Sequence, residues 1–366
     1  MIPYSKPSIT NLEHEYVCDA VINGWGKNCF EYIDQFERAF AEEVGSEFAA
    51  ATSSCTGALQ LGMHALGIGK GDEVILADIN WIATAAPIIH CGATPVFVDI
   101  SLKNWCISKE EIERAITDKT KAIVVTHLYG NIADIQEIVK LAKAKNVYVI
   151  EDAAEALGSK FDGKHVGTFG NFGVFSFHGT KMMTTGEGGM FISNDKQLYE
   201  KVCVLNNHGR STKEHRHFWP TEVGHKFKMS NIQAALGCAQ LTRLNSLVER
   251  KREILNFYKN SFKQYENVYM NIEPDNSINA SWMPTIFIQT ETESRDGLLG
   301  CLQKIKIDAR PTFWPLTSTG LFSKRNNKNA YFFQSRSLNL PSYHDMSNSD
   351  QELVCEAIKS YIDCSA

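Results

Sequence analysis

The chain has 366 residues, 43% hydrophobic and 22% charged, which is ordinary for a globular protein in water. A net charge of -5 gives no electrostatic reason to expect nucleic acid or an anionic membrane as a partner. No apolar run approaches the roughly 20 residues of a membrane-spanning helix, and MIPYSKPSITNLEHE lacks the pattern of a secretory signal. We therefore expect a cytoplasmic protein.

The ten cysteines are scattered, with no CxxC pair and no clustered histidine and cysteine spacing. A structural zinc site or a disulfide framework needs closer spacing or a smaller secreted chain. We expect reduced thiols and no metal site.

From residue 50 to about residue 200, short strand-like runs alternate with helix-like stretches such as Ile132–Lys145. Runs such as KAIVVTH and VYVIED are largely apolar, as in parallel strands that are buried on both faces. The region predicts an α/β sheet with helical crossovers. The predicted strands are Glu73–Ala77, Pro95–Asp99, Ala122–His127, Val147–Glu151, Gly173–His178 and Gly189–Ser193.

The pattern changes after about residue 230. One long helical pattern runs from Asn231 to Phe262, and strand candidates follow at Trp282–Gln289 and Lys306–Arg310. We predict a large domain over residues 1–235 and a smaller α+β domain over residues 236–366. The N-terminal segment is expected to join the small domain.

The segment SFHGTKMMTTGEGG places Lys181 just after a buried strand and before a glycine-rich turn. Burial disfavours the ammonium form of a lysine, and a neutral amine attacks aldehydes. Glycines let the backbone approach a ligand closely. A lone lysine here is more often a surface residue in a hairpin, so the prediction depends on its companions.

These companions lie upstream. Asp152 follows the strand Val147–Glu151, at the edge where open α/β sheets bind ligands. An aspartate there can pair with the protonated pyridine nitrogen of pyridoxal phosphate, although it can equally cap a following helix. Cys55 and Thr56, in ATSSCTGAL, begin an amphipathic helix whose free amides suit a phosphate. The alternative is that this segment is an ordinary capped helix start. Trp81 is placed to stack on a planar ring, but a lone tryptophan more often lies in the core.

In their order and spacing, these segments resemble the sugar aminotransferases of the DegT/DnrJ/EryC1/StrS family. The matching stretches include SSCTGAL, ATPVFVDI, HLYGN, VIEDAAEALGS, SFHGTK, TTGEGGM, MSNIQAALGCAQL and ARPTFWP, and the resemblance covers essentially the whole chain. Among the subgroups of this family, the chain looks most like the GDP-perosamine synthases, and it also resembles the 8-amino-3,8-dideoxy-octulosonate transaminase type. The resemblance implies the fold-type I architecture of aspartate aminotransferase, with a mostly parallel seven-stranded sheet. It also implies a homodimer whose partner subunit completes the cofactor site.

The resemblance further implies the cofactor, pyridoxal 5'-phosphate, with pyridoxamine phosphate as an intermediate. Lys181 would form the Schiff base, Asp152 would pair with the ring nitrogen, and Glu155 would lie near the 3-hydroxyl. We expect the sugar to bind near three residues and near the cationic loop His208–His217. That loop could equally be a solvated surface segment. The implied positions are Lys181 for catalysis; Cys55, Thr56, Trp81, Asp152, Glu155, Ser176 and Lys226 for the cofactor; and His178, Tyr129 and Arg310 for the sugar.

Four positions bear on the subgroup. Lysine at 181 argues against the dehydratase branch, which carries histidine there. Cys55 replaces the usual glycine of the phosphate turn, which is tolerable if only its backbone amide is required. Lys226 replaces an asparagine that reaches the partner's phosphate, and a lysine can make that contact. Thr317 replaces a histidine that the perosamine-type members place near the nucleotide-sugar.

The expected reaction moves an amino group from L-glutamate to a keto-sugar used in cell-surface polysaccharide such as the O-antigen of lipopolysaccharide. The first candidate is a nucleotide-linked 4-keto-6-deoxyhexose, and the alternative is 8-keto-3-deoxy-octulosonate. A DNA-binding regulator is disfavoured because no helix-turn-helix region is appended. A catalytically inactive sensor or scaffold is disfavoured because Lys181 and Asp152 are intact.

Overall fold

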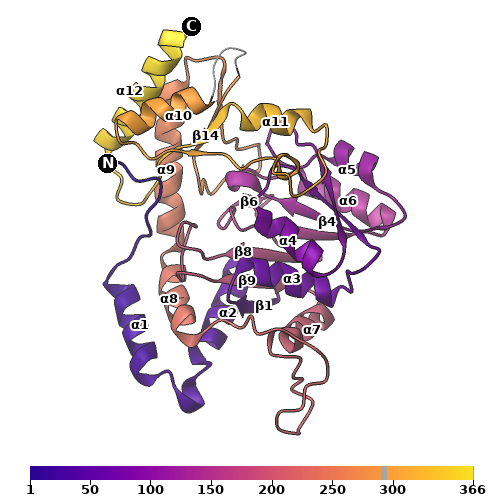
Figure 1. Ribbon diagram of the computed structural model, residues 1–366. Helices are drawn as coiled ribbons and strands as arrows, with labels where there is room; N and C mark the ends of the chain where they lie inside the picture. The colour runs from indigo at the N-terminus through magenta and orange to yellow at the C-terminus, as the bar shows by residue number, and fades with distance from the viewer. Residues whose placement is uncertain (290–294, 366) are drawn as a thin grey trace.

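A seven-stranded sheet forms the centre of the larger domain in the computed structural model, which describes residues 1–289 and 295–365 (Figure 1). The strand order is β1-β9-β8-β5-β4-β2-β3, and all pairs are parallel except those of β9 with its two neighbours. The predicted α/β class with a mostly parallel sheet is confirmed. The strands are β1 (Phe48–Thr52), β2 (Glu73–Ala77), β3 (Thr94–Val98), β4 (Thr120–Thr126), β5 (Tyr148–Asp152), β8 (Phe172–Ser176) and β9 (Gly189–Ser193).

Strand β1 is absent from the sequence prediction, whereas the other six agree with it to within two residues at each end. Its sequence, FAAAT, has almost none of the β-branched residues that mark a strand. Pairing with β9, in which Ala50 lies opposite Phe191, holds it at the edge of the sheet. Tertiary pairing therefore decides its conformation.

Helices cover both faces of this sheet, and neighbouring residues of one strand enter different cores. Ile75 of β2 packs in the core that includes α2 and α6, and Val74 packs in the core that includes α3, α4 and α7. Burial on both faces explains the largely apolar strands. The helices of this domain are α1 (Asn11–Asn23), α2 (Glu31–Val44), α3 (Cys55–Ala65), α4 (Ile82–His90), α5 (Lys109–Ala115), α6 (Ile135–Lys145) and α7 (Lys196–Asn206).

The single helix predicted over residues 231–262 is wrong. The structure has α8 (Asn231–Thr242) and α9 (Leu244–Phe262), separated at Arg243, whose φ of -104° and ψ of 1° leave the helical region. The Arg243 guanidinium donates to Glu13 Oε1 at 2.7 Å, and Gln240 Nε2 donates to the same oxygen at 2.6 Å. These bonds tie the junction to α1, a long-range contact that no local pattern announces.

The smaller domain contains a four-stranded antiparallel sheet in the order β10-β12-β14-β13. Its elements are β10 (Val268–Met270), β12 (Thr285–Ile288), β13 (Arg310–Pro311), β14 (Ser337–Asn339), α10 (Arg295–Lys304), α11 (Lys328–Gln334) and α12 (Asn348–Ser365). The predicted strand Trp282–Gln289 is shortened to β12, and the predicted strand Lys306–Arg310 is wrong except at Arg310, because Lys306 has a left-handed φ of 63°. A further small sheet joins β6 (Lys160–Phe161), β7 (Lys164–His165) and β11 (Ser277–Ile278).

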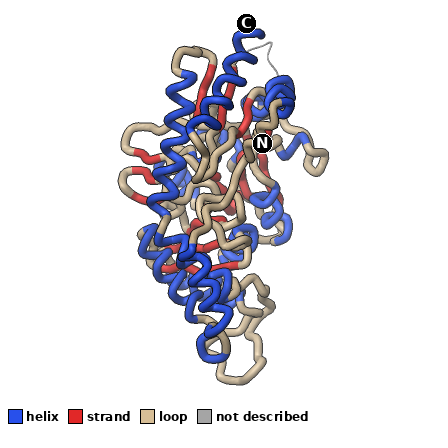
Figure 2. The backbone as a smooth tube through the Cα atoms, turned by 90° about the vertical axis from the view of Figure 1, so that its left-hand side faces the viewer, coloured by secondary structure: helices blue, strands red, loops and turns tan. Residues whose placement is uncertain are grey.

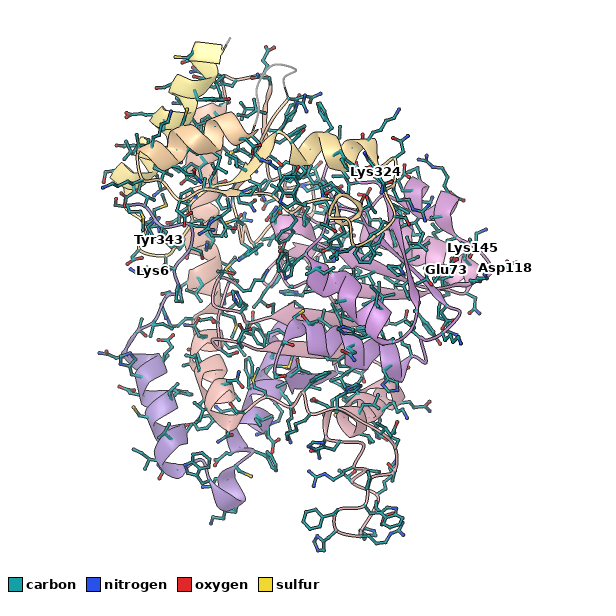
Figure 3. The ribbon with its side chains drawn as sticks, in the orientation of Figure 1. Lys6, Glu73, Asp118, Lys145, Lys324 and Tyr343 are labelled. Atoms are coloured by element: carbon teal, nitrogen blue, oxygen red, sulfur yellow. The ribbon has the colours of Figure 1, made fainter. Side chains whose placement is uncertain are left out.

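The N-terminal segment runs along the small domain, and both chain ends lie in its part of the molecule (Figure 2). Ile2 forms a parallel bridge with Ile307 and is buried in the small-domain core. Lys6 forms an ion pair with Asp345 and lies near Tyr343 in Figure 3. The division at residues 235 and 236 stays a prediction. Within the described ranges, no helix has the length and apolar character needed to cross a membrane.

Candidate active site

A cavity of about 390 Å³ lies at the carboxyl ends of β4, β5 and β8, beside the first turn of α3. Segments that are far apart in the sequence meet there. The predicted residues that line it are Cys55, Thr56, Trp81, Asp152, Glu155, Ser176, His178 and Lys181. The structure thus gathers most of the proposed site in one place.

Asp152 is the last residue of β5 and is 4% exposed. Its Oδ2 accepts a hydrogen bond from Thr84 Oγ1 at 2.6 Å, and its Oδ1 accepts from the Ala154 amide at 3.2 Å. Thr84 is in turn 2.9 Å from Asn80 Oδ1. The structure describes residues 153–159 as turns and irregular backbone rather than a helix, so the alternative that Asp152 caps a helix is wrong. The network fixes a buried carboxylate on the wall of the cavity.

The first turn of α3 faces the same cavity. Ser54 caps the helix by accepting the Gly57 amide at 3.0 Å, and Cys55 is the first helical residue, so its backbone needs no positive φ. A Cβ on Gly189 would lie 2.4 Å from the Cys55 amide nitrogen, so only glycine lets β9 approach this turn. Gly189 also pairs with Ser176 across the strands. Burial raises the pKa of the Cys55 thiol well above its ordinary value, so this side chain is neutral.

Lys181 lies in the turn that follows β8, with its side chain 14% exposed. Its Nζ is 3.2 Å from Glu155 Oε1 and 3.8 Å from the centroid of the Trp282 ring. Glu155 Oε2 accepts the Tyr129 amide at 2.9 Å. Burial raises the pKa of the Glu155 carboxyl, and the nearby Lys181 charge opposes that effect. The lysine amine is therefore held between a carboxylate and an aromatic face.

Two other predicted residues lie at the rim. His178 is exposed, and its Nε2 is 3.7 Å from Glu187 Oε1. Trp81 is 59% exposed, with its ring centroid 5.9 Å from that of Phe313. Both have side-chain surface that a ligand in the cavity can contact.

Three predicted residues do not line the cavity. Tyr129 is fully buried, and its hydroxyl accepts a hydrogen bond from the Phe313 amide at 2.7 Å, so it supports the wall rather than forming it. Arg310 is exposed, donates to Asp308, and lies 5.8 Å from the Tyr4 ring centroid. Lys226 is exposed and pairs with Asn207 in an isolated bridge, away from this subunit's cavity.

Thr317, the other departure in the sequence, is 3% exposed. Its hydroxyl donates to Asp78 Oδ2 at 2.6 Å, and its amide donates to Asp78 Oδ1 at 2.9 Å. Asn327 Nδ2 also donates to this carboxylate, at 2.8 Å. In this chain the position of the histidine is thus occupied by a residue with a structural role.

Comparison with known proteins identifies the family. The DegT/DnrJ/EryC1/StrS aminotransferase family matches residues 7–359. This chain belongs to that family. It is 41% identical to the GDP-perosamine synthase of Escherichia coli O157:H7 over 362 residues, 98% of each chain. It is 36% identical to the GDP-perosamine synthase of Vibrio cholerae over the full length of both.

Solved structures agree with this assignment. An aminotransferase from Psychrobacter cryohalolentis has a TM-score of 0.91 at 29% identity, covering 99% of this chain and 100% of the other. The PLP form of the putative sugar aminotransferase Spr1654 from Streptococcus pneumoniae has a TM-score of 0.90 at 27% identity, covering 100% and 99%. The predicted fold type, the aminotransferase class and the pyridoxal phosphate cofactor are confirmed.

The residues of this aminotransferase fit that cofactor. The cradle of α3 amides beside Ser176, which a Cβ on Gly189 would fill, suits a phosphate dianion. Asp152 can hold a protonated pyridine nitrogen, and Lys181 supplies the amine for the aldehyde. The donor set therefore fits the cofactor's phosphate, ring nitrogen and aldehyde.

Sequence reasoning missed several residues of this wall: Tyr4, Asn80, Thr84, Trp282 and Phe313. Tyr4 and Phe313 lie in stretches that resemble the family, but neither residue is assigned a role there, and Trp282 lies in no such stretch. Tyr4 comes from the N-terminal segment, and Trp282 and Phe313 come from the C-terminal part of the chain. Only the fold brings them beside Lys181.

Proposed function

We propose that this aminotransferase moves the amino group of L-glutamate to C4 of a nucleotide-linked 4-keto-6-deoxyhexose, giving a perosamine-type sugar for surface polysaccharide. The observation that carries the proposal is the joint placement of Lys181 and Asp152 in one cavity. The identity of the sugar is supported by relatives that carry the name GDP-perosamine synthase. These relatives do not favour the alternative substrate, 8-keto-3-deoxy-octulosonate.

The side chains divide the chemistry. Bound pyridoxal phosphate supplies an aldehyde that takes up the amino group and a ring that delocalises the electrons released at carbon. Asp152 holds the proton on the ring nitrogen, which keeps that ring electron-poor. The Lys181 amine takes a proton from the glutamate Cα and, in the second half-reaction, delivers one to the sugar carbon that gains nitrogen. The α3 amides and Ser176 anchor the phosphate.

The second substrate enters the same cavity after 2-oxoglutarate has left. The walls of the cavity are largely apolar and aromatic near Trp81 and Phe313, whereas Glu187 and His178 provide polar groups at the rim. Such a surface suits a deoxysugar with an apolar methyl face and a few hydroxyls. Sugar specificity is thus proposed to depend on the rim and on loops near it.

We also propose a homodimer in which Lys226 reaches the partner's phosphate. Lys226 is exposed and lies outside its own cavity, and the loop before it projects from the large domain after α7 (Figure 1). In this loop, Phe218 is 89% exposed and Val223 is 89% exposed. Large exposed apolar side chains are typical of surfaces that another chain covers.

The proposed function is tested by the absorbance spectrum of the purified protein with pyridoxal phosphate. Adding L-glutamate should bleach the band of the lysine-linked cofactor, and adding GDP-4-keto-6-deoxymannose should restore it. GDP should slow the restoration of the band by a nucleotide-linked sugar, because the two compete for the same site. GDP should not slow restoration by a free octulosonate. A protein that forms no band, or a band that glutamate leaves unchanged, would contradict the aminotransferase proposal.

The dimer is tested by mixing two inactive or impaired proteins. Lys181→Ala lacks the amine, and Lys226→Ala lacks the contact to the partner. A heterodimer contains one site with Lys181 from one subunit and Lys226 from the other. Activity that rises on mixing supports a shared site, and a strictly additive mixture contradicts it.

A further inference from the structure

We propose that Trp282 is a positioning residue that, together with Glu155, holds the Lys181 amine whenever that amine is not bonded to the cofactor. The inference rests on the proposed function, because only a lysine that is repeatedly linked and released needs such a holder. Trp282 carries no motif in the sequence, and its role follows from its contacts.

The first contact is with the amine itself. Lys181 Nζ lies 3.8 Å from the Trp282 ring centroid, well within the roughly 6 Å over which an aromatic face attracts a cation. Trp282 is 4% exposed, and water screens such an attraction little at a buried site. Glu155 Oε1 contacts the same nitrogen at 3.2 Å. The two groups define one position for the amine.

The second contact fixes the ring. Trp282 Nε1 donates to the Thr180 carbonyl oxygen at 2.7 Å. Because Thr180 directly precedes Lys181, the indole binds the backbone of the lysine loop by its edge and the amine by its face. Movement of the loop and movement of the indole are thereby coupled.

A strained backbone presents the indole. Ser281 has a left-handed φ of 61°, which is uncommon for a residue with a side chain. Its amide donates to Asn279 Oδ1 at 2.8 Å. A Cβ on Gly130 would lie 2.6 Å from that same oxygen, so glycine at 130 leaves the room that this turn needs. Strain of this kind persists only where the surroundings hold it, as they do at many functional sites.

Trp282 and Glu155 also share a support. The Tyr129 ring stacks on Trp282 with centroids 6.1 Å apart and an interplanar angle of 21°. The Tyr129 amide donates to Glu155 Oε2 at 2.9 Å. One buried residue therefore positions both groups that contact the lysine amine, which explains why Tyr129 is buried behind the wall instead of lining it.

The consequence concerns the return of the lysine. Linking moves one proton from the Lys181 ammonium to the Glu155 carboxylate that contacts it, forms a C=N bond between Lys181 Nζ and the aldehyde carbon of the cofactor, and releases one water. A free lysine side chain has several rotatable bonds, so an unheld amine spends most of its time away from the carbon. An amine held by Glu155 and Trp282 begins each linking step from one nearby position.

The test starts from cofactor-free protein and follows absorbance after rapid mixing with pyridoxal phosphate. Initial binding depends on the pyridoxal phosphate concentration, so in Trp282→Leu it is measured separately from the linking step, which does not. The concentration-independent linking step should be slower by about twofold to thirtyfold, the range that corresponds to a cation–aromatic contact. Trp282→Phe keeps an aromatic face and should lose less.

Trp105→Leu is the matched control. Trp105 is also buried, at 2% exposed, and packs against Phe333 with centroids 4.8 Å apart, outside the cavity wall. It should link at the wild-type rate if it remains folded. Gly130→Ala, which disturbs the Asn279–Ser281 turn without changing the indole, should slow linking as well.

The outcomes separate the two proposals. If Trp282→Leu links at the wild-type rate, this inference is overturned and the proposed function stands. If the wild-type protein forms no lysine-linked band, the proposed function fails and this inference fails with it. Should Trp282→Leu not fold, Trp282→Phe and Gly130→Ala carry the test, and wild-type linking rates in both overturn the inference.

Discussion

Replacing Gly189 with alanine should weaken pyridoxal phosphate binding without touching any group that contacts the cofactor. The added Cβ would lie 2.4 Å from the Cys55 nitrogen and 2.5 Å from the Ser54 carbonyl carbon, both backbone atoms. Ordinary contact begins near 3.4 Å, so the first turn of α3 must move by about 1 Å. Because Gly189 pairs with Ser176, this movement opens the phosphate cradle.

The size of the effect follows from hydrogen-bond geometry. A shift of about 1 Å lengthens an amide-to-phosphate contact from about 2.9 Å to about 3.9 Å, beyond hydrogen-bond range. Each bond to a charged group contributes about 1.5–3 kcal/mol. Loss of one or two therefore weakens binding by about 1.5–6 kcal/mol, or roughly tenfold to about twenty-thousandfold in Kd.

The assay is a titration of cofactor-free protein with pyridoxal phosphate, followed by absorbance and by tryptophan fluorescence. Gly300→Ala is the control, because its Cβ in α10 would meet nothing within 4 Å. Circular dichroism must show that Gly189→Ala is folded. A folded Gly189→Ala protein with the wild-type Kd would refute the assignment of the α3 turn as the phosphate site.

Three further predictions concern single side chains. Lys181→Ala should lose turnover but still bind the cofactor non-covalently, so that gel filtration removes it. Normal turnover in this variant would show that Lys181 has no part in the mechanism. Asp152→Asn should slow the reaction with glutamate about a hundredfold or more in single-turnover absorbance, and a loss below about tenfold would argue against pairing with the ring nitrogen. Burial lowers the pKa of the Lys251 amine from 10.5 to about 7, so the unfolded chain binds more protons between these values and wild-type stability rises over that pH range. Lys251→Met should remove this rise in thermal unfolding measured from pH 7 to 10, and equal slopes in both proteins would contradict it.

The sequence predicts those parts of the fold that depend on local pattern. The strands around Ile75 and Val124 are apolar on both faces and are found within two residues of their predicted positions. Strand β1 and the break at Arg243 escape prediction for the same reason. Each is set by contacts with residues far away in the chain, Phe191 in one case and Glu13 in the other.

The same division applies to the candidate site. Lys181 and Asp152 stand in motifs whose residue types state their chemistry, so they could be named from the sequence. Trp282 is a lone aromatic residue outside any motif, and Tyr4 comes from the N-terminal segment; they are about 100 and 180 positions from Lys181. The cavity they line forms only when the small domain and the N-terminal segment pack against the large one.

Tyr129 shows where motif reasoning reaches its limit. The stretch HLYGN directs attention to its aromatic residue, and a tyrosine near an active site is readily assigned to the substrate. In the structure its φ of 54° and the φ of 89° at Gly130 turn the chain so that the ring is buried and the amide faces Glu155. The conformation of the backbone, rather than the type of the side chain, decides the role. A motif can therefore mark the surroundings of an active site correctly while leaving open which of its residues contact the ligand and which hold those that do.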